Sequence, residues 1–388
     1  MMRRLYLLPV IFLALSVLVP QVGYAEEQAI ELADQAKSAL LMEMETGTIL
    51  YEKNSDERLS PASMTKIMTM LLMMEALEKG KIRLDEKIRT SEYAASMGGS
   101  QIFLEEGEEM TVDELLQAIA IGSANDASVV MAERIAGSEK AFVQMMNERA
   151  QQLGLKNTKF QNSTGLPAED HYSSAKDMAI MARELLKYDI ITKYTGQYES
   201  YLREGTKKKF WLVNTNRLVK FYPGVDGLKT GFTSEAKYCL TATAKRDGMR
   251  IIAVIFGAPT SKERNRQISK MFDYAYSQFE TVPLYKKGQT VGEVVVQKGE
   301  KQKLKAETES PISILVKKGE KVENIKKELE FEKVKAPVKK GDRIGTIKIS
   351  ENGNTIIEKS LVAGETIHPA SWWTLYKRTF KHLMKIES

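Results

Sequence analysis

The sequence pattern changes after Val282, and this change constrains the fold more than any other feature of the chain. Before it, helical segments rich in apolar residues alternate with short strands. After it, short strand-like runs are separated by Lys-Gly turns. The chain of 388 residues is long enough for two or three domains. We therefore expect an α/β mixed domain over residues 26–282, an antiparallel sheet covered by helices, and a small all-β domain over 283–370.

The expected elements follow from periodicity and turn residues. Polar residues interrupt the apolar helices at 122–126, where Asp126 is a candidate N-cap for the helix that follows. The other elements expected in the first part are a hairpin over 38–44 and 48–52, helices over 63–79, 112–121, 127–136, 141–153, 175–187 and 261–279, and strands over 225–229, 238–244 and 250–256. In the second part we expect strands over 290–296, 312–316, 343–349 and 355–361.

The N-terminal segment, residues 1–25, predicts a secretory signal peptide. Arg3 and Arg4 precede an apolar run of about 15 residues, which is shorter than the roughly 20 needed to span a bilayer. Small residues at Gly23 and Ala25 fit the cleavage site. The mature chain is expected to begin near Glu26 and to work outside the cytoplasmic membrane.

The C-terminal segment, residues 371–388, predicts an amphipathic helix lying on a membrane surface. At 100° per residue, two Trp and six other apolar or aromatic side chains share one face, and the basic side chains and His382 take the other. The segment carries too many charges to span the bilayer. A terminal helix packed on its own domain is the alternative. We expect peripheral attachment to the outer face of the cytoplasmic membrane through this helix.

The distribution of charge supports a membrane rather than nucleic acid. The net charge is +6, yet residues 26–282 hold 33 basic and 37 acidic side chains. The excess of positive charge therefore lies at the two ends and in residues 283–370, which hold 18 basic and 13 acidic side chains. One cysteine, Cys239, excludes an intramolecular disulfide, and with only three His a multi-ligand zinc site is not expected. We expect no metal and no cofactor.

The first candidate for chemistry is Ser63-Met64-Thr65-Lys66. On a helix, Ser and Lys at positions i and i+3 share a face, and in the first turn the serine lies at the positive end of the helix dipole. A serine hydroxyl becomes a good nucleophile when a neighbouring base takes its proton. Lys66 can be that base if burial and nearby cations keep it partly neutral.

Two further polar motifs follow. In Ser123-Ala124-Asn125, between two apolar helices, the hydroxyl could relay a proton and the carboxamide could hold a peptide backbone. Lys229-Thr230-Gly231 stands at the end of a predicted strand, where a cation and a hydroxyl suit a peptide that is laid along the strand and ends in a carboxylate. Glycine would let the substrate approach the backbone.

In this order, the patterns SxxK, SxN and KTG resemble the penicillin-recognising active-site serine enzymes, which are the β-lactamases and penicillin-binding proteins. Longer stretches are similar to the low-molecular-mass D-alanyl-D-alanine carboxypeptidases of the S11 peptidase family, and within them to the sporulation-type, DacF-like enzymes. The layout of signal peptide, catalytic domain, β domain and C-terminal helix is also similar. The stretches are LSPASMTKIMT, GSQIFLEEGEEMTVDELL, IGSANDASVVMAE, HYSSAKDMA and GVDGLKTGFT.

The resemblance implies a reaction and a substrate. Peptidoglycan stem peptides would be the partner, and the terminal D-alanine would be removed through an acyl-enzyme on Ser63, which β-lactam antibiotics would also acylate. Lys66 would be the general base and Ser123 the proton relay. Backbone N–H groups of Ser63 and Phe232 would form the oxyanion hole. The residues implied to bind substrate are Asn125, Lys229, Thr230, Gly231, Phe232 and, for its terminal carboxylate, Arg264.

The chain departs from the family pattern at two positions. Many members have histidine after the KTG glycine, where this chain has Phe232, and a relative has histidine where this chain has Thr164. These differences concern the deacylation rate and leave the acylation residues in place. His171, next to Tyr172, is expected to be structural, and Cys239 is expected to be a buried, inert thiol.

The motifs are also compatible with two alternative functions. A β-lactamase of class A would carry an ExxLN pattern between Asn125 and Lys229, which is missing, and SDN rather than SAN. A non-catalytic peptidoglycan-binding scaffold is disfavoured because the core residue of every motif is intact. The sequence therefore predicts a serine-type D-Ala-D-Ala carboxypeptidase.

Overall fold

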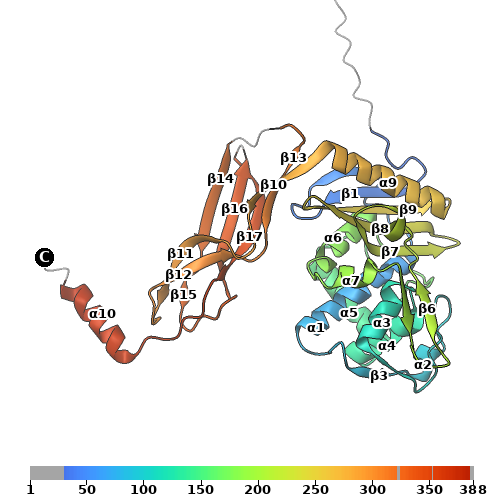
Figure 1. The fold of residues 1–388 in the computed structure, drawn as a ribbon, viewed down its shortest axis with the longest axis horizontal. Coiled ribbons are helices and arrows are strands. Elements are labelled where there is room, and N and C mark those ends of the chain that lie inside the picture. Colours follow the sequence, from blue (N-terminus) through green and yellow to red (C-terminus); the bar gives the residue numbers. More distant parts are fainter. Residues whose placement is uncertain (1–29, 321–323, 352, 385–388) are drawn as a thin grey trace, which may run out of the picture. The chain divides into compact units, whose positions relative to one another are not determined.

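The computed structural model describes residues 30–320, 324–351 and 353–384 (Figure 1). The predicted signal peptide, residues 1–25, lies outside the described residues, as do the last four residues of the predicted C-terminal helix.

The first domain is built on a five-stranded antiparallel sheet with strand order β2-β1-β9-β8-β7. The first strand of the N-terminal hairpin, β1, thus pairs with β9, which comes about 200 residues later in the chain. The strands are β1 Ser38–Glu43, β2 Ile49–Lys53, β7 Val225–Thr233, β8 Lys237–Arg246 and β9 Met249–Ala258. β8 and β9 are joined by a tight turn in which Asp247 and Gly248 both have positive φ (48° and 86°), as a two-residue hairpin requires.

Both faces of this sheet are covered by helices, as Figure 1 shows. Helix α9 (Ser261–Gln278) packs on one face, and α6 (Ala175–Leu185) packs on the other. The alternation of side chains along β9 divides its apolar residues between two cores: Val254 faces the core that contains α6, and the next residue, Ile255, faces the core that contains α9. A strand buried on both faces explains the nearly continuous apolar run of β9.

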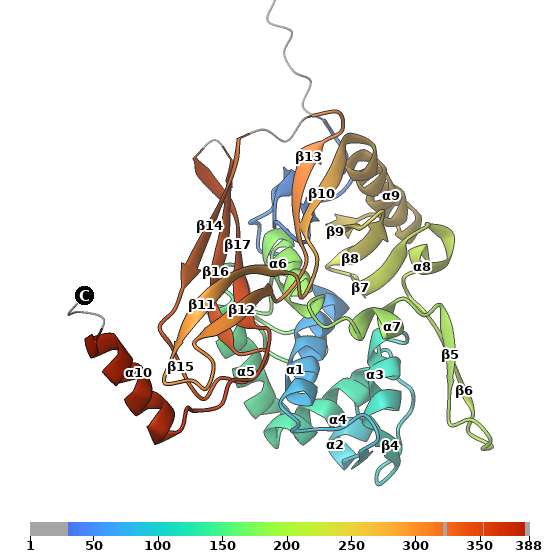
Figure 2. The same ribbon diagram turned by 60° about the vertical axis from the view of Figure 1, so that its left-hand side comes forward.

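Helix α1 (Lys66–Glu78) runs through the centre of the helical region (Figure 2). It is apolar around almost its whole circumference and contacts α3, α4, α5 and α6. The remaining short helices are α2 Glu92–Ala95, α7 Ile191–Thr195 and α8 Leu218–Phe221, and the surrounding long ones are α3 Val112–Ala120, α4 Asn125–Ala136 and α5 Glu139–Gln152. A one-turn 3-10 helix, η1 (Ala62–Thr65), precedes α1 directly.

Two small two-stranded sheets in the helical region were not predicted. They are β3 Lys87–Arg89 with β4 Glu109–Thr111, and β5 Glu199–Leu202 with β6 Phe210–Val213. Their strands have only three or four residues, which is too short for a periodicity of two to stand out in the sequence.

The C-terminal domain is all β, as predicted. Its two sheets have strand orders β10-β13 and β14-β16-β17-β12-β11-β15 and share an apolar core. The strands are β10 Phe279–Tyr285, β11 Thr290–Gln297, β12 Lys303–Thr308, β13 Ile312–Lys317, β14 Ile325–Phe331, β15 Val334–Lys335, β16 Arg343–Glu351 and β17 Asn354–Ala363. The predicted domain boundary at Val282 falls inside β10. The glycines of three predicted Lys-Gly turns, Gly288, Gly319 and Gly341, have positive φ.

Helix α10 (Trp372–Met384) follows the β domain. Within the described residues, no helix is both long enough and apolar enough to cross a membrane.

Candidate active site

Ser63 lies in η1, the 3-10 turn that directly precedes α1. Its neighbours Ala62, Met64 and Thr65 are buried, whereas Ser63 is partly exposed. Ala62 adopts a left-handed backbone conformation with φ of 46°, which is uncommon outside glycine. The chain therefore turns sharply before Ser63 and leaves this one hydroxyl of the turn open to solvent.

Lys66 is the first residue of α1, and its ammonium is completely buried. The Nζ atom lies 3.2 Å from Ser63 Oγ, 2.6 Å from Asn125 Oδ1 and 2.6 Å from the backbone oxygen of Thr164. These three contacts come from three separate segments of the chain. They bring the predicted nucleophile, the predicted base and the predicted SxN asparagine together around one nitrogen atom.

The environment of Lys66 favours its neutral form. Burial lowers the pKa of Lys66 well below its ordinary value, the positive charge of Lys229 lowers it further, and only Asp126 opposes this. A neutral amine has two N–H bonds and one lone pair. When Asn125 Oδ1 and the Thr164 oxygen accept the two N–H bonds, the lone pair is left to face Ser63 Oγ. This geometry allows Lys66 to accept the hydroxyl proton.

Ser123 and Asn125 lie at the junction between α3 and α4. Ser123 is buried and has a φ of 63° in the left-handed region, so this junction is a strained, closely determined segment. The carboxamide of Asn125 is oriented by two protein partners, because Oδ1 accepts from Lys66 and Nδ2 donates to Gly98 O at 2.7 Å. Asn125 thereby helps to hold the Lys66 amine in place.

The prediction that Asp126 caps α4 is wrong. The N-cap position is Ala124, without a side-chain hydrogen bond, and Asp126 lies inside the first turn. Its carboxylate accepts hydrogen bonds from the backbone N–H groups of Ile102 and Leu104 at 3.1 Å. Asp126 thereby holds the segment before β4 against α4, and it is also the acidic group that acts on Lys66.

A loop over residues 161–171 closes the site on the side of Lys66. Its Thr164 backbone oxygen accepts the Lys66 hydrogen bond, and Gly165 (φ 85°) lies directly against η1. A Cβ on Gly165 would stand 1.9 Å from the backbone oxygen of Ala62 and 2.9 Å from the nitrogen of Ser63. Only glycine lets this loop approach Ser63 so closely.

The KTG motif lies within β7, which extends to Thr233 instead of ending at residue 229 as predicted. β7 is the last strand of its sheet, so one edge has no partner strand among the described residues. A Cβ on Gly231 would stand 2.5 Å from the backbone oxygen of Pro61. The missing side chain therefore allows β7 to pack against η1, and this brings the third motif beside the first.

Lys229 and Arg264 form a buried positive region. The Lys229 Nζ atom donates to the Thr230 backbone oxygen at 3.0 Å. The pKa of Lys229 is lowered to about 7, mainly by burial and also by the positive charge of Arg264. Arg264, in the first turn of α9, donates to Asn265 Oδ1 and to the Cys239 oxygen, which are neutral acceptors. Burial lowers its pKa to about 10. Among the described residues, no acidic side chain forms an ion pair with either cation. This region suits an anionic ligand.

Phe232 is the exposed neighbour of these cations. Its ring is 55% exposed and packs at a tilt on Tyr238 of β8, with 4.5 Å between ring centroids. Where the family resemblance leads us to expect a histidine, the chain thus presents an apolar surface. Cys239, next to Tyr238, is fully buried as predicted, and burial raises its pKa to about 11.

His171, at the C-terminal end of the 161–171 loop, holds this loop against η1 by hydrogen bonds. Nδ1 accepts from the Gln161 N–H at 3.2 Å, so the proton is assigned to Nε2, which donates to Thr65 Oγ1 at 2.8 Å. Burial lowers the pKa of His171 to about 4. The residue is neutral and joins the loop to η1, which agrees with the expected structural role.

Two contributors to the site had no sequence signal of their own. One is the Thr164 backbone oxygen, because a carbonyl group is present at every position. The other is Thr215, whose hydroxyl lies 2.7 Å from that of Thr230 and whose N–H donates to Ile121 O, so that it links the third motif to the end of α3. Only its place two residues after the end of β6 explains this role.

Comparison with known proteins agrees with this site. The family model described as D-alanyl-D-alanine carboxypeptidase, of peptidase family S11, matches residues 25–260, and the one described as penicillin-binding protein 5, C-terminal domain, matches residues 279–369. The chain belongs to the S11 family of D-alanyl-D-alanine carboxypeptidases. It is a serine peptidase with the penicillin-binding protein 5 type of fold, so the predicted family, fold class and enzyme activity are confirmed.

Individual relatives support the same conclusion. The chain is 63% identical over 350 residues to the D-alanyl-D-alanine carboxypeptidase DacF of Bacillus subtilis (strain 168), which covers 90% of each chain. It is 34% identical to DacC of Escherichia coli (strain K12), over 90% of this chain and 89% of that one. The crystal structure of penicillin-binding protein 5 from Haemophilus influenzae has a TM-score of 0.67 at 32% identity and covers 86% of this chain and 98% of that one.

The contact between β7 and η1 is testable at Gly231. We expect Gly231→Ala to slow acylation by a labelled penicillin by about 10²-fold, because its Cβ would push Lys229 and Thr230 away from Ser63. Gly98→Ala is the matched control, since a Cβ there meets nothing within 4 Å and the substitution keeps the backbone oxygen that accepts from Asn125. Equal acylation rates for the two variants would contradict the role given to this contact.

The burial of neutral His171 predicts a pH dependence of stability. Its pKa is 6.5 when unfolded and about 4 when folded, so its contribution to the free energy of unfolding is present above pH 6.5 and is lost as the pH falls towards 4. Across this range, wild type should lose up to about 3 kcal/mol relative to His171→Gln, which does not titrate. Urea unfolding across the range measures the difference, and parallel pH profiles would refute the assignment.

Proposed function

We propose that this carboxypeptidase removes the terminal D-alanine from peptidoglycan pentapeptide stems through an acyl-enzyme on Ser63. The observation that carries the proposal is the position of Lys66 Nζ, 3.2 Å from Ser63 Oγ and held by two further acceptors. Lys66 takes the proton of Ser63 as the hydroxyl attacks the carbonyl between the two D-alanines. The backbone N–H groups of Ser63 and Phe232 hold the oxyanion that forms.

The remaining motif residues act on the peptide. The substrate lies along the free edge of β7 and adds main-chain hydrogen bonds to it. Its terminal carboxylate is held by Thr230 and by the positive charge of Lys229 and Arg264, which have no acidic partner among the described residues. Ser123 passes a proton to the leaving D-alanine, and Asn125 keeps the base in place. Water then releases the shortened peptide.

β-Lactams would acylate the same serine, since they enter as acyl donors that carry a carboxylate. Solved structures of a similar protein support this: penicillin-binding protein D2 of Listeria monocytogenes, in its ampicillin-bound form, is 30% identical to this chain with a TM-score of 0.54, and covers 62% of this chain and 98% of that one. A role in sporulation stays a prediction, favoured by the similarity to DacF.

The nucleophile is tested by one substitution and one control. Ser63→Ala should lower the release of D-alanine from a diacyl-D-Ala-D-Ala peptide by at least about 10⁴-fold, since no other group can form the acyl-enzyme. It should also abolish covalent labelling by penicillin, which peptide mapping of the wild type should place on Ser63. Ser60→Ala, the same change three residues earlier and outside η1, should leave both readouts unchanged. A wild-type protein that neither turns over the peptide nor takes up penicillin would refute the proposal.

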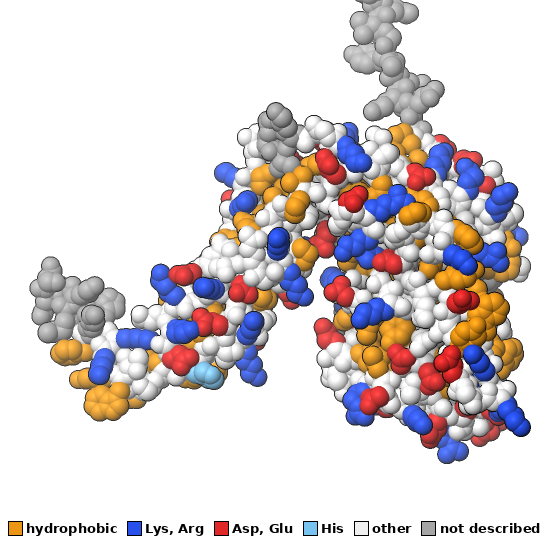
Figure 3. Space-filling view, viewed as in Figure 1, with side chains coloured by type: hydrophobic (Ala, Val, Ile, Leu, Met, Phe, Trp, Pro, Cys, Tyr) orange, Lys and Arg blue, Asp and Glu red, His pale blue; other side chains and the backbone are white. Residues whose placement is uncertain are grey.

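We further propose that the enzyme is exported and attached peripherally to the outer face of the cytoplasmic membrane by α10. Figure 3 shows hydrophobic side chains gathered on this helix. Trp372 and Trp373 are 67% and 65% exposed, and Tyr376 and Phe380 are also more than half exposed. Tyr376 stacks on the rings of both Trp372 and Phe380. An exposed aromatic row on an amphipathic helix suits the boundary between headgroups and acyl chains.

This attachment predicts release on truncation. Deleting residues 371–388 should move the protein from anionic lipid vesicles to the supernatant in a sedimentation assay, because the aromatic row and the basic side chains are removed together. Thr374→Ala, within the same helix but outside the aromatic row, should sediment like wild type. A truncated protein that still sediments with vesicles would contradict the proposal.

A further inference from the structure

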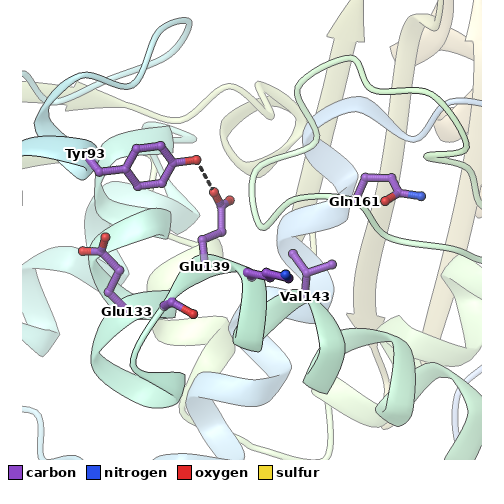
Figure 4. Close-up of a pocket in the computed structure, with 7 residues that line it drawn as sticks. Tyr93, Glu133, Glu139, Val143 and Gln161 are labelled. Atoms are coloured by element: carbon purple, nitrogen blue, oxygen red, sulfur yellow. Dashed lines mark hydrogen bonds between the residues drawn. The ribbon is translucent and has the colours of Figure 1, made fainter.

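Glu139 lies outside the three motifs, at the first residue of α5. The N-cap of this helix is Ser138, whose hydroxyl accepts from the Ala141 N–H, so the carboxylate of Glu139 is not needed for capping. It points instead towards Tyr93, across a surface pocket of about 620 Å³ that is also lined by Glu133 and Gln161 (Figure 4). Its hydrogen bonds connect this pocket with the loop behind it.

The carboxylate of Glu139 accepts three hydrogen bonds from neutral donors. Oε1 accepts from the backbone N–H of Ser163 at 3.0 Å and from the Ser163 hydroxyl at 2.7 Å. Oε2 accepts from the hydroxyl of Tyr93 at 2.7 Å, and this bond is the main reason that the pKa of Tyr93 rises to about 12. Two of the three bonds thus fix a single residue of the 161–171 loop.

Ser163 is fully buried and is held from the opposite side as well. Its backbone oxygen accepts from the hydroxyl of Thr69, one turn after Lys66 on α1, at 2.7 Å. The peptide units on both sides of Ser163 are therefore hydrogen bonded, one to a side chain of α5 and one to a side chain of α1. The loop has little freedom to shift along either helix.

The next residue of the loop is Thr164, whose backbone oxygen accepts from Lys66 Nζ at 2.6 Å. Gly165 then abuts Ala62 and Ser63 with no room for a side chain. A displacement of Ser163 must move the Thr164 oxygen, because the two are consecutive. The contact that sets the direction of the Lys66 lone pair is thus held in place by a carboxylate on another helix.

We propose that Glu139 is a positioning residue for the acylation step: through Ser163 it holds the Thr164 backbone oxygen against Lys66. This inference deepens the proposed function and rests on it. Glu139 touches neither the substrate nor the reacting atoms. Glu139 acts on the orientation of Lys66, the general base. Its loss should therefore lower the rate of acylation more than it weakens the initial binding of the acyl donor.

The test is the acylation of the full chain by a labelled penicillin, with the rate constant of the covalent step separated from the dissociation constant of the preceding complex. Glu139→Ala should lower the rate constant by about 10²-fold and change the dissociation constant less than threefold, on the scale expected for a misplaced catalytic group. Glu133→Ala, which lines the same pocket but bonds Ser91 rather than the loop, should acylate like wild type.

Glu139→Gln separates positioning from charge. Its amide oxygen can accept both Ser163 donors while its NH₂ group donates to the Tyr93 oxygen, so the variant should recover most of the wild-type rate. Equal losses in Glu139→Ala and Glu139→Gln would overturn the proposal in favour of an electrostatic role. Wild-type acylation by Glu139→Ala would overturn it outright.

Two further variants keep the test decisive if Glu139→Ala fails to fold. Ser163→Ala removes one of the two bonds to Glu139 and should give a smaller loss of the same kind, whereas Tyr93→Phe leaves both loop bonds and should acylate almost normally. A Ser163→Ala variant that matches wild type would refute the proposal. If the wild-type protein takes up no penicillin, the proposed function fails, and that result is distinct from each of these.

Discussion

The burial of the Lys66 amine is the constraint on which the rest of the site depends. A lysine without water is stable only if its polar atom is fully hydrogen bonded, and here Asn125, Thr164 and Ser63 supply the three partners. The same burial lowers the pKa of Lys66, so that one arrangement both hydrogen bonds the amine and favours the neutral form that the proposed base requires. Three parts of the chain must meet for this to happen.

The fold achieves this meeting through close backbone packing at glycines. Gly165 lets the loop approach the turn of Ser63, and Gly231 lets β7 approach the same turn from the sheet. The apolar helix α1 passes through the helical region and contacts helices on several sides. Its first residue, Lys66, is therefore buried in the interior. The chemistry at Ser63 therefore depends on interhelical and helix–sheet contacts far more than on local sequence.

Much of the catalytic domain could be predicted. Long amphipathic or apolar segments such as α3 and α9 have strong periodicity, and the Asp247-Gly248 turn has characteristic residues. The two small two-stranded sheets were missed because strands of three or four residues have little periodicity. Asp126 was assigned to a cap because its position before an apolar helix fits that pattern, whereas its long-range bonds to the 102–104 backbone decided the outcome.

The sequence by itself determined the family, the two domain classes and the identity of the motif residues, since these depend on residue type, order and spacing. The tertiary structure alone decided which atoms surround Lys66. The Thr164 contact is made by a backbone oxygen and the Glu139 contacts by a carboxylate 24 residues away from Ser163. Backbone groups carry no residue-specific signal, and a long-range hydrogen bond exists only after helices and loops have packed. For this physical reason, the groups that orient the base could be found only in the folded chain.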